Sequence, residues 1–150
     1  MPRPAGARPH GALPAEFAEI GPDSWTEPFW LAAREHRLTI PTGVNCGTFR
    51  FPPGPFCYAC QHQDVEQVQV PGTGTVYTFT VARHGVVPAL AAFVPYVVAV
   101  IELDGAPGVR VIGNIVESDP EAVEVGSRVE VAWDDVTDEV TIPRYRLAAQ

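Results

Sequence analysis

The second half of the chain is a series of short segments with β-strand composition, and this series limits the fold more than any other feature. The segments are rich in Val, Ile, Tyr and Thr and are separated by Gly, Pro or Asp turns, a pattern typical of strands. They cover residues 74–83, 95–103, 108–116, 127–135 and 139–146. Five such strands, with a short helical or turn insert at 118–126, predict a small Greek-key barrel of the OB type.

The first part of the chain predicts an arm followed by a helix. Residues 1–24 are rich in Pro, Gly and Ala and have no sustained period, so we expect an extended arm that is ordered only where it lies on something. Residues 24–37 predict a helix with Thr26 as its N-cap. Phe29 and Trp30 give this helix an aromatic face, which packs either within the protein or on a partner.

All three cysteines lie in one short stretch, at residues 46, 57 and 60. Cys57 and Cys60 form a complete C-x-x-C turn, whereas the residue three positions before Cys46 is Gly43. A structural zinc site of this kind normally takes two ligands from each of two such turns. His62 is the nearest replacement for the fourth ligand.

The segments around the cysteines predict a small hairpin module. Residues 37–43, 47–53 and 64–72 have the composition of short strands. Zinc would cross-link hairpins that are too small to fold alone. The alternative is a module that packs without metal through three aromatic side chains, those of Phe49, Phe51 and Phe56.

The elements together predict a mainly β protein in three parts. These are the arm at 1–24, the helix and ribbon at 25–70, and the OB-fold barrel at 71–147. The odd number of cysteines, without a secretory signal, indicates reduced thiols or a metal site rather than a disulfide framework. We therefore expect a cytoplasmic protein.

Composition and charge exclude several function classes. The net charge of −8 disfavours general nucleic-acid binding, because binding to phosphates needs clustered cations. The chain has no lysine, which excludes Schiff-base chemistry at a lysine. No apolar run approaches the roughly 20 residues of a membrane span.

The sequence assigns no catalytic residue. The cysteines all lie within the ribbon pattern, and no serine lies in a G-x-S-x-G motif. Paired carboxylates occur at Asp134–Asp135 and Asp138–Glu139. We expect these pairs to lie in solvated turns.

The order of the elements resembles the DUF35 family, which has an N-terminal helix, a rubredoxin-like zinc ribbon and an OB-fold domain. The resemblance covers about residues 27–146, and family members usually carry a cysteine where Gly43 sits. The matching stretches are EPFWLAAREHRLTI, NCGTFRFPPGPFCYAC, GTGTVYTFTVAR, PYVVAVIELDG and DPEAVEVGSRVEVAWDDVTDEVTIPRYR.

The resemblance implies an accessory subunit rather than a self-sufficient enzyme. Members of the family are associated with thiolase-like acyltransferases, thiolases and aldolases that act on CoA thioesters in lipid or steroid metabolism. We therefore expect a heterotetramer with a thiolase-like homodimer that supplies the catalytic groups. The alternatives are a free-standing acyl-CoA-binding module and a single-stranded nucleic-acid-binding OB protein.

The resemblance also assigns roles to particular residues. Zinc is expected at Cys46, Cys57 and Cys60 with His62, and the partner is expected at Phe29 and Trp30. Arg83 and His84 follow a barrel strand where OB barrels open their ligand face, so they are candidates for binding the CoA phosphates, although an ordinary exposed loop also fits. The apolar loop at 85–95 is expected to cover an acyl chain or contact the partner.

Overall fold

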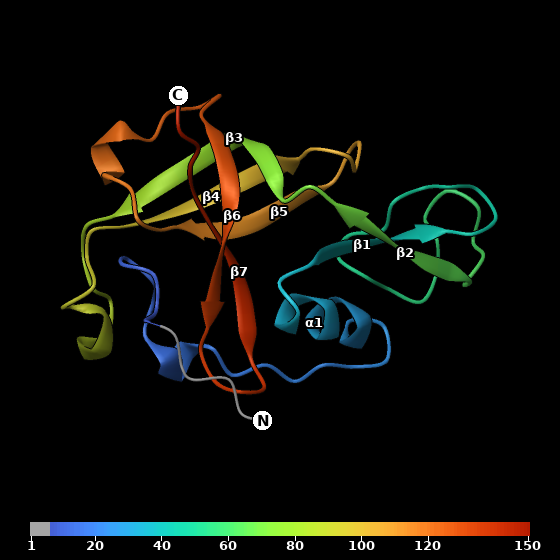
Figure 1. Ribbon diagram of the computed structural model, residues 1–150, viewed down its shortest axis with the longest axis horizontal. Helices are drawn as coiled ribbons and strands as arrows, with labels where there is room; N and C mark the ends of the chain where they lie inside the picture. The colour runs from blue at the N-terminus through green and yellow to red at the C-terminus, as the bar shows by residue number, and fades with distance from the viewer. Residues whose placement is uncertain (1–6) are drawn as a thin grey trace.

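The computed structural model describes residues 7–150 and contains a closed barrel with a small ribbon beside it (Figure 1). Each barrel strand lies within two residues of its expected position. The strands are β3 (Thr73–Ala82), β4 (Tyr96–Leu103), β5 (Arg110–Ile115), β6 (Arg128–Asp135) and β7 (Thr141–Leu147). Alternation of side chains across β4 buries Val97, Ala99 and Ile101 inside the barrel.

The strand order around the barrel is β3-β4-β5-β7-β6. β3 closes the barrel by pairing antiparallel with β6, and β5 pairs parallel with β7. A short 3₁₀ helix, η3 (Pro120–Ala122), lies between β5 and β6, and Asp119 caps it by accepting a hydrogen bond from the N–H of Glu121. This arrangement confirms the mainly β, OB-type fold expected from the sequence.

The ribbon consists of β1 (Leu38–Gly43) and β2 (Val65–Val70), which pair antiparallel. The loop that joins them carries all three cysteines. The strand expected at 47–53 is wrong, because this segment makes only an isolated bridge between Thr42 and Phe49. Pro52 and Pro53 have no N–H to donate and so cannot continue a ladder.

Helix α1 runs from Glu27 to Arg34 and is shorter than the segment 24–37 expected from the sequence. Thr26 holds the N-cap position, but its side chain makes no capping hydrogen bond. Asp23 instead accepts hydrogen bonds from the N–H groups of Trp25 and Thr26, at 2.9 and 2.8 Å. The helix ends where His36 adopts a left-handed conformation, with φ of 57°.

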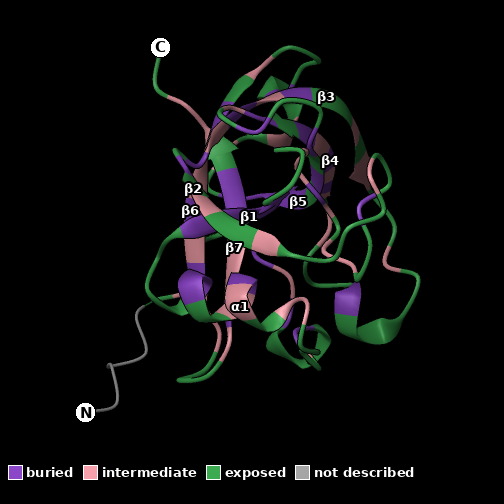
Figure 2. Ribbon diagram, turned by 90° about the vertical axis from the view of Figure 1, so that its right-hand side faces the viewer, coloured by how far each residue is buried: buried purple, intermediate pink, exposed green. Residues whose placement is uncertain are grey.

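The helix, the ribbon and the barrel share one hydrophobic core. Phe29 of α1 and Leu38, Ile40 and Val70 of the ribbon belong to the same cluster as the barrel residues. β1 is buried at every position, whereas β2 has exposed positions (Figure 2). The base of the ribbon is therefore anchored on the barrel, and the cysteine loop projects from it.

The described part of the N-terminal arm lies on the barrel. The carbonyl of His10 accepts a hydrogen bond from the N–H of Glu117 at 2.7 Å. Ala12 packs with Val116 and Ala132 in a second small cluster. A 3₁₀ helix, η1 (Ala15–Phe17), follows. Residues 1–6 of the expected arm lie outside the described residues, and within 7–150 none of the helices has the length and apolar character to cross a membrane.

Candidate metal centre and binding surfaces

The ribbon loop brings the three cysteine thiols together. The Sγ atoms of Cys46, Cys57 and Cys60 all lie within 4.8 Å of one another, and those of Cys46 and Cys57 are 3.5 Å apart. Thiolates bonded to one tetrahedral zinc ion, at about 2.3 Å each, lie about 3.8 Å apart. The three thiols therefore fit one side of a zinc site.

Tight turns hold these thiols in place. The N–H of Cys57 donates to the carbonyl of His62, and the N–H of Gln61 donates to the carbonyl of Cys57, each at 3.0 Å. Backbone N–H groups of Cys60 and Ala59 also point to the Cys57 sulfur. These hydrogen bonds lower the pKa of Cys57 to about 6, and the one from Cys60 has the largest effect. They outweigh burial, which acts in the opposite direction and raises the pKa. The turn thus favours the thiolate that a metal requires.

No residue from 7 to 150 supplies a ligand atom at the fourth position of the centre. Gly43 lies at this corner, since a Cβ atom added to it would be 3.2 Å from Cys46 Sγ. His62, the expected replacement, lies outside the group of clustered thiols. Its ring Nδ1 is instead 3.1 Å from the carbonyl oxygen of Cys60. The structure thus brings three of the four expected ligands together.

Arg50 is a buried cation next to this corner, and its role was not predicted from the sequence. It is 3% exposed, and its Nη2 would lie 3.7 Å from a Cβ atom at Gly43. Among the described residues its guanidinium donates only to backbone carbonyls, and its Nε has no hydrogen-bond partner. The accepting carbonyls belong to Gly54, His62, Gln63 and Asp64. Arg50 therefore ties the two halves of the cysteine loop together.

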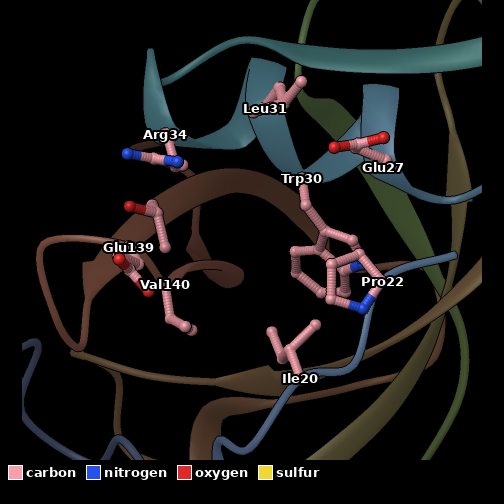
Figure 3. Close-up of a pocket in the computed structure, with 9 residues that line it drawn as sticks. Ile20, Pro22, Glu27, Trp30, Leu31, Arg34, Glu139 and Val140 are labelled. Carbon is pink, nitrogen blue, oxygen red and sulfur yellow. The ribbon is translucent and has the colours of Figure 1, made fainter.

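A groove of about 310 Å³ separates α1 from the turn between β6 and β7. Trp30 points into it toward Ile20, Pro22 and Val140, as Figure 3 shows. Charged side chains of α1 and the turn stand around this apolar centre, namely Glu27, Arg34 and Glu139. Phe29, the other expected partner residue, is only 8% exposed and packs edge-to-face on Trp30. Leu31, half exposed, also lines the groove.

A second cavity, of about 510 Å³, lies between the N-terminal arm, the loop at 92–95 and the start of η3. Phe93, Tyr96 and Val116 contribute apolar walls, and His10 and Ser118 contribute polar groups. The neighbouring loop exposes Val86 and Val87. Much of this surface is therefore suited to an apolar ligand or partner.

Arg83 and His84 are both exposed and come directly after Ala82, the last residue of β3. Arg83 forms an ion pair with Glu121 of η3. Pro120, the residue before Glu121, lines the second cavity. The expected CoA-phosphate residue is therefore next to that cavity, but its guanidinium is occupied by a carboxylate.

Asp134 is a buried residue whose role the sequence did not reveal. The expectation of a solvated Asp134–Asp135 turn is wrong for Asp134, which lies within β6 and is 0% exposed. Its carboxylate accepts hydrogen bonds from Arg8 at 2.8 and 2.9 Å and from Arg144 at 2.7 Å. Asp134 lies two positions after the buried Ala132 in β6, so both side chains point to the same face of the strand. This spacing was the signal that could have identified Asp134 as buried.

Ion pairing extends to most of the described arginines. Surface arginines paired with carboxylates lie on and around the barrel and just after the end of α1. These pairs are Arg37–Glu35, Arg83–Glu121, Arg110–Glu102, Arg128–Asp104 and Arg146 with Glu117 and Glu130. Such pairing leaves little unneutralised positive charge for a phosphate backbone.

The fold and the cysteine centre define a protein with a rubredoxin-like ribbon joined to an OB barrel, and two family models agree. The ChsH2 rubredoxin-like zinc ribbon domain matches residues 30–66, and the ChsH2 C-terminal OB-fold domain matches residues 67–134. The chain belongs to the DUF35 family, as the sequence resemblance indicated. The matched zinc ribbon and the thiol cluster together favour zinc as the metal.

Three known proteins illustrate the relationship. A probable enoyl-CoA hydratase alpha subunit of Thermomonospora curvata is 37% identical over 97% of this chain, but the chain spans only 42% of that protein. A DUF35 domain-containing scaffold protein of Methanothermobacter thermautotrophicus is 30% identical over 71% of this chain and 78% of its own length. A solved chain of the Ltp2-ChsH2(DUF35) aldolase is 35% identical, with a TM-score of 0.78 over 87% of this chain and all of the other.

Proposed function

We propose that this chain is an accessory subunit that binds a thiolase-like enzyme acting on CoA thioesters. The main support is the similarity, over the whole of the solved chain, to the DUF35 component of an Ltp2-ChsH2 aldolase. The name of the Thermomonospora relative, an enoyl-CoA hydratase alpha subunit, points to the same substrate class. The partner supplies the catalytic groups, and two copies of this chain on a partner homodimer make a heterotetramer.

The groove beside α1 is the proposed contact surface for the partner. Its apolar centre at Trp30, Ile20 and Val140 is the kind of surface that gains from desolvation in an interface. Phe29 supports this surface by packing against the Trp30 ring, with the two ring centroids 5.0 Å apart. The groove leaves the cysteine loop and the second cavity free for other roles.

Co-expression with a candidate thiolase-like protein from the same genome tests the proposal. We expect one complex by size exclusion with light scattering, and loss or strong reduction of partner activity without this subunit. Leu31→Glu places a charge on the groove and should weaken the complex by at least about tenfold, since hot-spot changes of 2 kcal/mol or more are common in interfaces.

Val125→Glu is the matched control, because Val125 is also exposed but lies in the turn before β6, away from the groove. It should leave the complex intact. A partner that is fully active alone, with this chain as a separate species, would contradict the subunit proposal.

A second candidate function is binding of the acyl-CoA itself. The 510 Å³ cavity favours it, since its size and apolar walls are those of a small-molecule site. In this proposal the acyl group enters the cavity past Phe93, and the CoA phosphates displace Glu121 from Arg83 and reach His84. The extensive pairing of arginines gives the single-stranded nucleic-acid alternative no support.

Isothermal titration with a CoA thioester tests this second candidate. Arg83→Gln should weaken binding several-fold, because it removes a charge-assisted contact to phosphate. Arg110→Gln, on an exposed arginine paired with Glu102 on the barrel, should have no effect. Absence of saturable heat with the chain alone and with its partner complex would exclude the acyl-CoA role.

A further inference from the structure

The described part of the chain gives the cysteine centre no fourth ligand, and this leaves one position for a donor from outside. Structural zinc sites are almost always four-coordinate, whereas the described residues gather only three clustered ligand atoms, the thiols of Cys46, Cys57 and Cys60. We propose that the centre binds a divalent metal through these three thiolates and takes an external thiolate as its fourth ligand. This inference is independent of the proposed partner enzyme.

The corner where this ligand would bind lies beside Gly43. The residue is held at the end of β1 by a hydrogen bond from its N–H to the carbonyl of Thr48, at 2.9 Å. A Cβ atom in this position would already contact Cys46 Sγ, at 3.2 Å. Arg50 Nη2 and the carbonyl oxygen of Thr48 would also lie close to it, at 3.7 and 3.8 Å. This corner of the cluster, the gap, therefore has no side chain that could supply the fourth donor, and a donor bound there would contact Cys46 and Arg50.

The charge next to this gap favours an anionic donor. Arg50 is buried, and its Nη2 would be 3.7 Å from the same Cβ position. Its hydrogen bonds within residues 7–150 go to neutral carbonyls, and its Nε has no partner among these residues. A buried cation is stabilised by a nearby negative charge. Three thiolates and a divalent metal would carry a net charge of −1, and a fourth thiolate would raise it to −2 next to the Arg50 cation, whereas a neutral imidazole would leave it unchanged.

His62 is the internal competitor for this position, and its placement does not favour it. The side chain is exposed and its Nδ1 faces the carbonyl oxygen of Cys60, at 3.1 Å. To act as a ligand, the imidazole would have to leave this contact and bring a nitrogen to the thiol cluster. The proposal therefore predicts that His62 is dispensable for metal binding.

Cobalt substitution tests the proposal, because the absorption bands of Co²⁺ report on the number of bound thiolates. The full chain is loaded with one equivalent of Co²⁺ and titrated with 2-mercaptoethanol and, separately, with imidazole. We expect the thiol to change the charge-transfer and ligand-field bands saturably, with release of its proton to the buffer. Imidazole should bind at least about tenfold more weakly than the thiol.

Gly43→Cys closes the gap with a thiolate from the chain. It should show bands like those of the thiol-saturated wild type and no response to 2-mercaptoethanol. Its zinc affinity, measured by competition with a chelator, should rise by at least about tenfold. Mutation of a group that only hydrogen-bonds to a metal ligand already changes metal affinity by about 10–100-fold, and a direct ligand should have at least the smaller of these effects. Gly54→Cys adds a cysteine where no atom lies within 4 Å, and serves as the matched control with unchanged bands.

His62→Ala separates the external ligand from an internal one. We expect it to keep the wild-type cobalt bands and the response to the thiol. A wild-type protein that binds less than about a tenth of an equivalent of metal would overturn the proposal. So would unchanged bands on addition of thiol, or a His62→Ala variant whose initial bands differ from those of the wild type.

Discussion

Asp134 is a fully buried carboxylate on β6, and two arginines from distant parts of the chain neutralise it. Arg8 comes from the N-terminal arm and Arg144 from β7. Arg144 is itself 6% exposed, and its Nη1 also lies 3.4 Å from the side-chain oxygen of Asn114. This network joins the arm to the barrel through a single residue.

Removal of this carboxylate should destabilise the protein strongly. Asp134→Ala leaves the Arg144 guanidinium buried without its counter-charge, which costs about 3–5 kcal/mol. Glu102→Ala removes an exposed partner of Arg110 and should cost less than about 1 kcal/mol. Urea unfolding followed by circular dichroism gives both values. Equal losses for the two variants would contradict this account of Asp134.

The same residue predicts how stability depends on pH. Burial alone would raise the pKa of Asp134, but hydrogen bonds from Arg8 and Arg144, together with their charges, hold it below the ordinary value. Because the pKa is lowered on folding, the ionised carboxylate stabilises the protein above about pH 4. This contribution is lost as the pH falls through the lowered pKa of the folded state.

Comparison of the wild type with Asp134→Asn measures this effect. The difference in free energy of unfolding between the two should be the same at pH 7 and pH 5, and should shrink below pH 4 as the wild-type carboxylate becomes protonated. A difference that stays constant down to pH 2 would show that its charge does not contribute.

At the scale of secondary-structure elements, β5 and β7 approach closely because one residue has no side chain. A Cβ atom added to Gly113 of β5 would lie 2.6 Å from the Tyr145 ring of β7. Tyr145 is 1% exposed and fills the barrel interior. The glycine is therefore required for the parallel pairing of these two strands.

Gly113→Ala should destabilise the barrel by about 1–3 kcal/mol, the usual cost of overpacking a core. Gly21→Ala, at a position with no atom within 4 Å, should change stability by no more than about 0.5 kcal/mol. Thermal unfolding by calorimetry measures both. A Gly113→Ala protein as stable as the Gly21→Ala control would mean that the Tyr145 ring moves aside at no cost.

At the scale of the whole molecule, the ribbon is divided between a part that shares the barrel core and a part that does not. Leu38 and Ile40 of β1 are 3% and 0% exposed and lie in the common cluster. The cysteine loop contributes only Phe49 and Phe51 to this cluster, as partly buried side chains. A metal bound at the three thiols, together with Arg50, would therefore hold much of the loop.

Removal of metal should loosen the loop and spare the rest of the protein. After treatment with a chelator, we expect faster amide exchange at residues 44–64 and unchanged protection in β1 and the barrel strands. Hydrogen exchange with mass spectrometry measures this by segment. Cooperative loss of protection in the barrel would contradict it, because it would show that the common core depends on the metal.

The amino-acid sequence alone determined the elements that depend on local pattern. Alternating β-branched residues and Gly or Pro turns located all five barrel strands, and the spacing of Cys57 and Cys60 located the ribbon. The pattern was misleading at 47–53, where composition favoured a strand but Pro52 and Pro53 prevent pairing. It was also misleading at the start of α1, where Asp23 takes the capping role expected of Thr26.

Only the tertiary structure decided which side chains meet across the chain. The meeting of Arg8 and Asp134, 126 positions apart, has no signal in local sequence. The same is true of the burial of Arg50 beside Gly43, and of Trp30 facing the turn between β6 and β7. Local propensities act over a few residues, whereas these contacts depend on closure of the barrel and on packing of the arm and helix against it.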